Sequence, residues 1–199
     1  MKICVVTFYD DNIKIYGDIT SEINKRYCNK YNIDFKVKKD RTYKVRKANW
    51  EKIPTILDYI VYYDYIIWID ADAIFYNDAE NIINIINKHK DADFIFSNDI
   101  NNRNINTGFF IIKNSNYSIH LLNLWSNNKN IYKYTLNSKY EDQAGLEYIF
   151  RKNIMDIKKH CIIYKYGYLQ HFNFNKIDKL ENTYVLHLAG RGRNKNLRA

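Results

Sequence analysis

Continuous apolar runs occur at several places in the chain and predict buried strands. Residues 2–8 and 65–69 are short, apolar and rich in β-branched side chains, as in strands that are covered on both faces. Phe35 and Val37 alternate with charged residues, which predicts a strand with one exposed face. Similar runs predict later strands at residues 94–96, 107–113, 162–164 and 184–188.

Amphipathic stretches separate these runs and predict helices. In residues 18–31 the side chains Ile19, Ile23 and Tyr27 recur every four positions, and Asp18 at the start is a suitable N-cap. The same reasoning predicts helices at residues 50–62, at 78–89, in a segment that begins after Ser115, and at 141–152. Pro54 is compatible with the second helix because it falls in the first turn.

The alternation of strand and helix predicts an α/β fold with a mainly parallel central sheet flanked by helices. With 199 residues, 46% of them apolar, and only 1 Pro and 6 Gly, the chain suits a single domain over residues 1–199, with residues 194–199 as a basic tail. Ligands of such sheets bind at the carboxyl ends of the strands. Asp70 and Asp72 follow an apolar run directly, so the site is expected there.

The formal charge of +9 suits polyanionic partners: nucleic acid, an acidic membrane surface or phosphorylated small molecules. The densest basic segment, residues 36–47, fits a phosphate-facing role and a solvated loop equally well.

The three cysteines, Cys4, Cys28 and Cys161, are widely spaced and form no CxxC pair, which supports neither a zinc ribbon nor a disulfide framework. We therefore expect reduced thiols in a cytoplasmic protein. No apolar stretch is long enough for a signal peptide or a transmembrane helix, so the protein is expected to be soluble.

Two carboxylates at positions i and i+2 after an apolar strand indicate a cation site. Uncompensated charge is costly at the edge of a core, so Asp70 and Asp72 are expected to meet a divalent ion. Mg²⁺ and Mn²⁺ both take oxygen ligands, and an imidazole from His187, at the end of another apolar run, would favour Mn²⁺. The pattern alone also fits solvated aspartates at a turn and a structural histidine.

Two further polar segments are candidates for sugar contacts. Asn106 and Thr107 precede Gly108, whose missing side chain lets a ligand approach the backbone closely. Asp142 and Gln143 open a predicted helix, where acid complements the helix dipole and where a carboxylate and an amide could also face a sugar.

Near the end of the chain, Arg191 and Arg193 follow Gly190. Their guanidinium groups could bind a diphosphate in a bidentate manner, or they could belong to a basic tail.

The order of these motifs resembles the galactosyl/mannosyl/xylosyltransferase family often called GMA12/MNN10. The resemblance runs from about Lys47 to Arg193 and rests on Trp50, the segment 68–73, the segment 106–110, the pair 142–143 and the segment 187–190. It implies a GT-A fold, which is a Rossmann-like nucleotide-diphospho-sugar transferase domain, together with metal dependence and retention of anomeric configuration. Family members usually carry a membrane anchor and a longer catalytic region, so compact soluble relatives from viruses or bacteria are the expected comparison.

The resemblance also implies individual roles. Asp72 and His187 would be metal ligands, and Asp70 would contact the metal or the nucleotide ribose. Asp142 and Gln143 would face the donor sugar and the acceptor. The other implied contacts are the base with Thr7 and Tyr9, the sugar with Asn106, Thr107 and Gly108, and the diphosphate with Lys47, Gly190 and Arg191.

The predicted function is therefore transfer of a sugar from a nucleoside diphosphate sugar, UDP favoured over GDP, to a hydroxyl of a glycan or glycoprotein, with Mn²⁺ or Mg²⁺ as cofactor. A haloacid-dehalogenase-like phosphatase also uses Asp-x-Asp, but on its first strand, whereas Asp70 follows two predicted strand–helix units. A basic nucleic-acid-binding domain would use the charge but leaves the acids unexplained, and we expect no nucleic-acid partner. The donor sugar, the acceptor and the oligomeric state are not encoded in these motifs.

Overall fold

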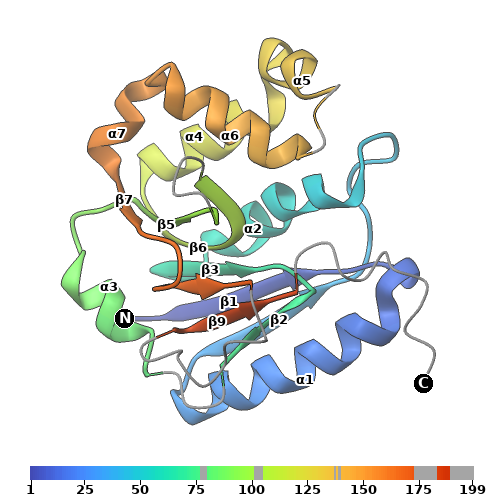
Figure 1. Ribbon diagram of the computed structural model, residues 1–199, viewed down its shortest axis with the longest axis vertical. Coiled ribbons are helices and arrows are strands. Elements are labelled where there is room, and N and C mark those ends of the chain that lie inside the picture. Colours follow the sequence, from blue (N-terminus) through green and yellow to red (C-terminus); the bar gives the residue numbers. More distant parts are fainter. Residues whose placement is uncertain (77–79, 101–104, 137, 139, 173–182, 189–199) are drawn as a thin grey trace.

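A six-stranded sheet forms the centre of the molecule, with helices on both of its faces (Figure 1). The computed structural model describes residues 1–76, 80–100, 105–136, 138, 140–172 and 183–188. In spatial order the strands are β2 (Asp34–Lys38), β1 (Ile3–Phe8), β3 (Tyr65–Ile69), β6 (Ile105–Lys113), β5 (Phe94–Asn98) and β7 (Cys161–Tyr164).

The sheet is parallel except at β6, which confirms the predicted mainly parallel architecture. β1 pairs in parallel with β2 and β3, and β5 with β7, whereas β6 is antiparallel to both of its neighbours. Ile69 at the end of β3 lies opposite Phe109 near the start of β6. Because β6 is reversed, its first residues lie at the edge where β1 and β3 end.

A separate three-stranded sheet consists of β4 (Ala73–Phe75), β9 (Val185–His187) and β8 (Gln170–His171), in that order. β4 pairs antiparallel with β9, and Ala73 lies opposite His187. The predicted strand near residue 187 is therefore present but does not belong to the central sheet. β4 and β8 are too short to show a two-residue periodicity, and the sequence did not predict them.

Two hydrophobic cores lie on opposite faces of the central sheet because alternate strand residues point to opposite sides. Cys4, Val6 and Phe8 of β1 join the core formed with the helices above the sheet in Figure 1, while Ile3 and Val5 join the other core. The upper helices are α2 (Lys52–Ile60), α4 (Asn116–Asn127), α5 (Lys129–Thr135), α6 (Glu141–Arg151) and α7 (Ile157–His160). The other core contains residues of α1 (Lys14–Lys30), α3 (Ile83–Lys88) and the small sheet.

Helix α1 differs from its prediction in where it begins. It starts at Lys14 after the 3₁₀ turn η1 (Asp11–Ile13), with Ile13 in the N-cap position. Asp18 is therefore not a cap but lies inside the helix. Its carboxylate accepts a hydrogen bond of 2.7 Å from the Tyr9 hydroxyl and pairs with Lys14.

The inner face of α1 is small and polar rather than apolar. Its buried residues are Gly17, Thr20, Ser21, Asn24, Tyr27 and Cys28. Ile19, by contrast, is 57% exposed. An apolar stripe on a helix ordinarily faces a core, but of the predicted stripe Tyr27 is buried, Ile23 is half-buried and Ile19 is exposed, so the periodicity gave the helix correctly and its orientation only in part.

Most of the remaining elements agree with the predictions to within two residues, but the helix predicted at residues 78–89 is the shorter α3 (Ile83–Lys88), and residues 78 and 79 of that prediction lie outside the described residues. The Ser115 hydroxyl caps α4 by accepting a bond of 3.1 Å from the Ser118 backbone N–H. A 3₁₀ turn η2 (Ala48–Glu51) precedes α2, and α5, η3 (Ile154–Asp156) and α7 were not predicted.

All three cysteines are free. No helix in the described part of the chain combines the length and the apolar character needed to cross a membrane.

Candidate active site

Asp70 and Asp72 lie in a tight turn between the central sheet and the small sheet. The Asp70 backbone N–H donates to the Gly108 carbonyl at 2.8 Å, which extends the pairing of β3 with β6, and Ala73 N–H donates to the Asp70 carbonyl at 3.0 Å. The Trp68 indole N–H donates to Asp70 Oδ1 at 2.7 Å. The bond from the indole fixes the orientation of the Asp70 carboxylate.

The polar inner face of α1 holds the other side of this turn. The Thr20 hydroxyl donates to the Ala71 carbonyl at 2.7 Å. The Asn24 amide donates to the Ala73 carbonyl at 3.0 Å and accepts from the Phe75 N–H at 2.8 Å. Thr20 satisfies a backbone carbonyl of the turn, and Asn24 satisfies backbone groups of the short strand β4, which would otherwise be buried without partners. This is why α1 turns polar side chains inward.

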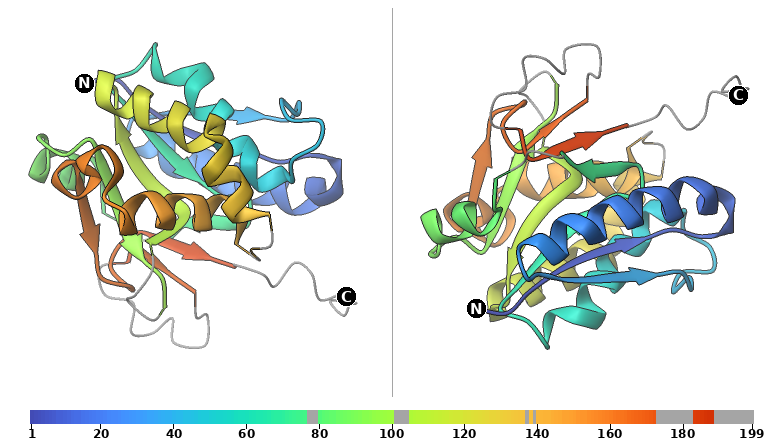
Figure 2. Two further views of the ribbon diagram at one scale, coloured as in Figure 1. Left: turned by 90° about the horizontal axis from the view of Figure 1, so that it is seen from above. Right: turned by 90° about the horizontal axis from the view of Figure 1, so that it is seen from below.

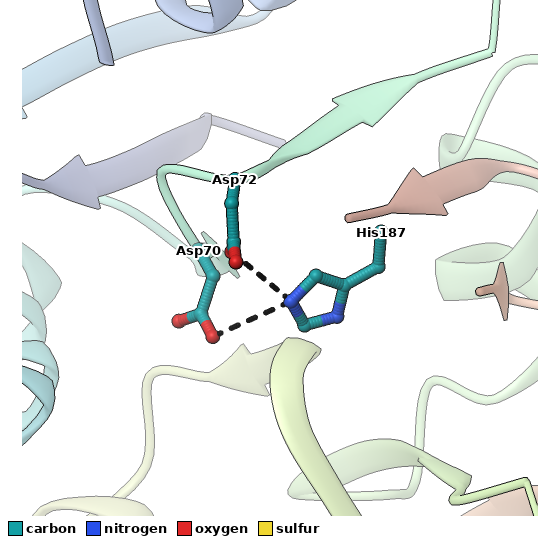
Figure 3. Close-up of side chains that lie close together, drawn as sticks. All are labelled: Asp70, Asp72 and His187. Carbon is teal, nitrogen blue, oxygen red and sulfur yellow. Dashed lines mark hydrogen bonds and ion pairs between the residues drawn. The ribbon is translucent and has the colours of Figure 1, made fainter. Parts of the chain in front are cut away.

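His187 completes a cluster with the two aspartates (Figure 3). Its Nε2 atom lies 3.1 Å from Asp72 Oδ1 and 3.8 Å from Asp70 Oδ2. A backbone hydrogen bond also joins the segments that carry His187 and Asp72, since the Leu188 N–H donates to the Asp72 carbonyl at 2.8 Å. One ligand atom from each of the three side chains lies within 4.8 Å of the others. The structure therefore brings together the three residues named as metal ligands.

A buried amide orients His187. Nδ1 of the imidazole lies 3.3 Å from Gln170 Oε1, and the Gln170 amide N–H₂ donates to Asn106 Oδ1 at 3.0 Å. When Nδ1 carries the proton and donates it to Gln170, the Nε2 lone pair faces the carboxylates. A neutral imidazole in that tautomer is the form that binds a metal ion. The sequence did not single out Gln170.

Gly108 is required here because the His187 ring lies directly against it. A Cβ atom at position 108 would be 2.1 Å from His187 Cε1 and 3.0 Å from Asn106 Oδ1. The sequence suggested that the missing side chain admits a ligand. In the structure the imidazole occupies that space, and the Gly108 N–H donates to Asn106 Oδ1 at 2.8 Å.

The electrostatics of the cluster favour an ionised Asp72. Burial opposes the charge, but when no metal is bound and His187 carries a proton on both ring nitrogens, its hydrogen bond and positive charge outweigh burial and hold the pKa of Asp72 below its ordinary value. Asp72 and His187 therefore present a carboxylate and an imidazole toward each other, as a divalent cation would require.

Lys52 contacts both Asp70, next to the metal-ligand candidates, and Asp142, at the start of α6. The sequence did not single out this residue. The side chain is 2% exposed, and its Nζ lies 2.7 Å from Asp142 Oδ2, 3.4 Å from Asp70 Oδ1 and 2.8 Å from the Thr107 carbonyl. Burial disfavours its charge, but Asp142 and Asp70 outweigh that effect and raise the pKa of Lys52. Lys52 precedes Ile56 and Ile60 at four-residue spacing, so its place on the apolar helix face could have flagged it.

Asp142 lies at the start of α6 and is fully engaged. Its Oδ1 accepts from the Asn49 amide at 2.7 Å, and its Oδ2 accepts from the Thr107 hydroxyl at 2.9 Å as well as from Lys52. Trp125 donates its indole N–H to the Asp142 carbonyl at 2.9 Å. Both carboxylate oxygens and the backbone carbonyl of Asp142 therefore accept hydrogen bonds.

Gln143 is the next residue of α6. Its side-chain oxygen accepts from the Thr107 N–H at 3.4 Å, and its amide N–H₂ donates to Glu147 Oε1 at 3.1 Å. The segment that begins β6 and the start of α6 are therefore adjacent, as the predicted sugar contacts require.

The two residues predicted to hold the base lie at the end of β1. The Thr7 hydroxyl is buried and has no hydrogen-bond partner in the described part of the chain. Tyr9 follows β1, and its ring packs against Gly17. It borders a groove of about 380 Å³ between α1 and β2, which Phe35 and Val37 also line. None of the metal-ligand candidates lines this groove.

The basic segment 36–47 is largely neutralised within the protein. Lys38 pairs with Asp58 at 2.5 Å, Lys39 with Asp18 at 3.3 Å and Arg41 with Glu51 at 3.8 Å. Arg46 stacks on the rings of Tyr43, Trp50 and Tyr132. Lys47, the predicted diphosphate contact, pairs with Glu141. Gly190 and Arg191 lie outside the described residues, as does Arg193.

The central sheet and its helices form the GT-A fold, which solved glycosyltransferases share. Residues 16–196 match the nucleotide-diphospho-sugar transferase family, and the chain belongs to it. No curated protein matches the sequence. The protein is thus a glycosyltransferase of that family.

Solved structures of glycosyltransferases share the fold at low sequence identity. A glycosyltransferase involved in glycosylation of the major capsid of PBCV-1 superposes with a TM-score of 0.73 at 14% identity, over 95% of this chain and 94% of that one. The galactosyltransferase LgtC, solved with donor and acceptor sugar analogues, gives 0.60 at 15% identity, over 94% and 87%. GlyE of Streptococcus pneumoniae gives 0.51 at 14%, over 82% of this chain and 45% of that one.

Proposed function

We propose that this glycosyltransferase is metal-dependent and that it moves a sugar from a nucleoside diphosphate sugar to a hydroxyl of a glycan. The observation that carries the proposal is the convergence of Asp70, Asp72 and His187 within 4.8 Å at the carboxyl edge of β3. Two carboxylates and one imidazole suit Mn²⁺ better than Mg²⁺. We favour a UDP-sugar as donor, with a GDP-sugar as the alternative.

The three ligands fit a divalent ion by their chemistry. Asp70 and Asp72 offer hard oxygen atoms, and Gln170 holds the imidazole of His187 with Nε2 toward them. When bound, the ion neutralises the charge that develops on the departing nucleoside diphosphate. The chain itself adds a second positive charge at this edge, the buried Lys52 ammonium 3.4 Å from Asp70.

We place the donor sugar against the start of β6 and the start of α6. Asn106, Thr107 and Gly108 provide one wall, and Asp142 with Gln143 provides the other. In support, Thr107 donates its hydroxyl to Asp142 and its backbone N–H to the Gln143 side chain. Lys52 fixes this arrangement because it bonds to Thr107 and Asp142 together.

We further propose that the reaction proceeds with retention. An inverting reaction would need a general base facing the acceptor hydroxyl, and Asp142 is the candidate at this site. Both of its carboxylate oxygens already accept bonds, from Asn49 on one side and from Lys52 and Thr107 on the other. A carboxylate so engaged positions its neighbours rather than abstracting a proton.

The nucleotide is proposed to lie between the metal cluster and the end of β1. Thr7 and Tyr9 would contact the base, and the Thr7 hydroxyl, which has no partner among the described residues, supports this placement. Lys47, Gly190 and Arg191 are proposed for the diphosphate. Lys47 would exchange its present partner, Glu141, for a phosphate oxygen.

The alternatives are not favoured. A haloacid-dehalogenase-like phosphatase needs a free nucleophilic first aspartate, whereas Asp70 accepts from Trp68 and pairs with Lys52. A nucleic-acid-binding role would rest on the basic segment 36–47, most of whose cations pair with acids of the chain or stack on its aromatic rings.

A donor screen tests the proposal. The melting temperature is measured with UDP- and GDP-sugars, each with and without Mn²⁺, because ligands that bind the native state raise it. We expect a UDP-sugar to stabilise the wild type only when Mn²⁺ is present, and Asp72→Ala to lose that shift. Absence of a shift with every donor, or an equal shift in Asp72→Ala, would contradict the proposal. Retention is tested separately by NMR of the product anomer.

A further inference from the structure

The outer side of α1 carries large apolar side chains that nothing in the described part of the chain covers. Ile15 is 76% exposed and Ile19 is 57% exposed, and Ile13 and Tyr16 beside them are also exposed. Figure 2 (right) looks onto α1 from below, and no described element lies in front of it. An exposed apolar cluster of this kind marks an interaction surface.

The apolar residues form a stripe that continues into basic residues. Ile15, Ile19 and Ile23 are four positions apart and therefore lie along one side of the helix. Continued at the same helical spacing, the stripe reaches Arg26 and Lys30, and no acidic residue falls within it. The acids of α1, Asp18 and Glu22, lie on a neighbouring side and pair with Lys14 and Arg26.

We propose that the stripe formed by Ile15, Tyr16, Ile19, Ile23, Arg26 and Lys30 docks the protein on the surface of an anionic membrane. An apolar side flanked by basic residues is the pattern of helices that lie in the plane of a bilayer interface. The formal charge of +9 complements anionic lipid, whereas the same charge opposes the approach of a second copy.

The helix is already ordered for this role. Thr20 and Asn24 bind its inner side to the turn that carries the two aspartates, so no folding has to accompany docking. The start of α1 follows the end of β1, which places one end of the stripe at the sheet edge that also bears the acid–histidine cluster. The inference concerns a surface outside the catalytic site and does not depend on the proposed metal or donor.

Cosedimentation with vesicles tests the inference, with phosphatidylcholine vesicles compared with vesicles that also contain phosphatidylglycerol. We expect the wild type to bind the anionic vesicles only, and less strongly as salt is added. Ile15→Gln/Ile19→Gln should weaken binding by about tenfold or more, because each isoleucine loses its transfer into lipid. Arg26→Glu/Lys30→Glu should weaken binding and reduce its salt dependence.

The matched control is Val61→Gln/Tyr62→Gln, at two exposed apolar residues that follow α2. This control should bind vesicles as the wild type does, and all variants should keep the wild-type melting temperature. Failure of the wild type to bind anionic vesicles, or an equal loss in the control, would overturn the inference. So would a dimer in sedimentation velocity that Ile15→Gln/Ile19→Gln dissociates, since a second copy would then be the occupant.

Discussion

His187 Nε2 lies 3.1 Å from Asp72 Oδ1, although the two residues are 115 positions apart in the chain. Two strands of three residues each, β4 and β9, make this contact by pairing antiparallel next to the turn that carries Asp72. The cluster thus depends on a small sheet as well as on the central one.

Replacing Asp72 with Asn should abolish binding of Mn²⁺ by the protein alone. The substitution keeps the shape of the side chain but removes the charge that His187 and a divalent ion both require. Isothermal titration with Mn²⁺ and no donor measures the effect. Asp91→Asn, at an exposed carboxylate after α3, is the matched control and should bind as the wild type does. Unchanged affinity in Asp72→Asn would exclude Asp72 as a ligand.

Gly108→Ala should destabilise the protein by about 1–3 kcal/mol because the added methyl group overlaps the His187 ring. The same substitution made together with His187→Ala should cost much less, since the ring is then absent. Urea unfolding of the four proteins of this cycle gives the coupling free energy. Additive costs would show that another contact, such as the one with Asn106, is responsible.

Lys52→Met should cost about 3–5 kcal/mol of stability, because it leaves the buried Asp142 without its counter-ion. Adding Asp142→Asn should recover part of that loss by removing the stranded charge. Thermal or urea unfolding of the single and double variants measures this. A double variant less stable than Lys52→Met would mean that Asp142 is held mainly by its other partners.

Asn24→Ala should cost about 2 kcal/mol or more and should also weaken Mn²⁺ binding. The substitution leaves the Ala73 carbonyl and the Phe75 N–H without their side-chain partner, and both belong to β4. Asn29→Ala, at an exposed position of the same helix, is the control and should be close to neutral. A loss of stability with unchanged metal affinity would separate the helix contact from the geometry of the cluster.

Stability should fall as the pH rises above about 9, in part because of Cys4. Burial raises the pKa of its thiol from 9.0 to about 12, so between these values the unfolded chain loses a proton that the native protein keeps. The slope is at most about 1.4 kcal/mol per pH unit for one such thiol. Urea unfolding at pH 8 and pH 10 under reducing conditions should show a smaller fall for Cys4→Ala than for the wild type. Equal falls would assign the effect to other groups.

The apolar pattern predicted most of the central sheet because strands covered on both faces need continuous apolar runs. The bounds of β3, Tyr65–Ile69, are those that the pattern predicts. The pattern could not show that β6 runs antiparallel, since strand direction depends on the connection rather than on the strand itself. That reversal puts the segment Asn106–Gly108 at the same edge as Asp70.

The sequence by itself determined the α/β class and the place of Asp70 and Asp72 at a strand end, because apolar periodicity and residue chemistry are local properties. It named His187 only as a candidate partner. Only the tertiary structure decided how α1 is turned, with Asn24 inward and Ile19 outward, and that Lys52 is buried between two aspartates. These features depend on which backbone groups and charges need a partner once the chain is folded. Hydrogen bonds to β4 and the counter-ion for Asp142 outweigh what hydrophobicity alone would favour, and no local pattern carries that information.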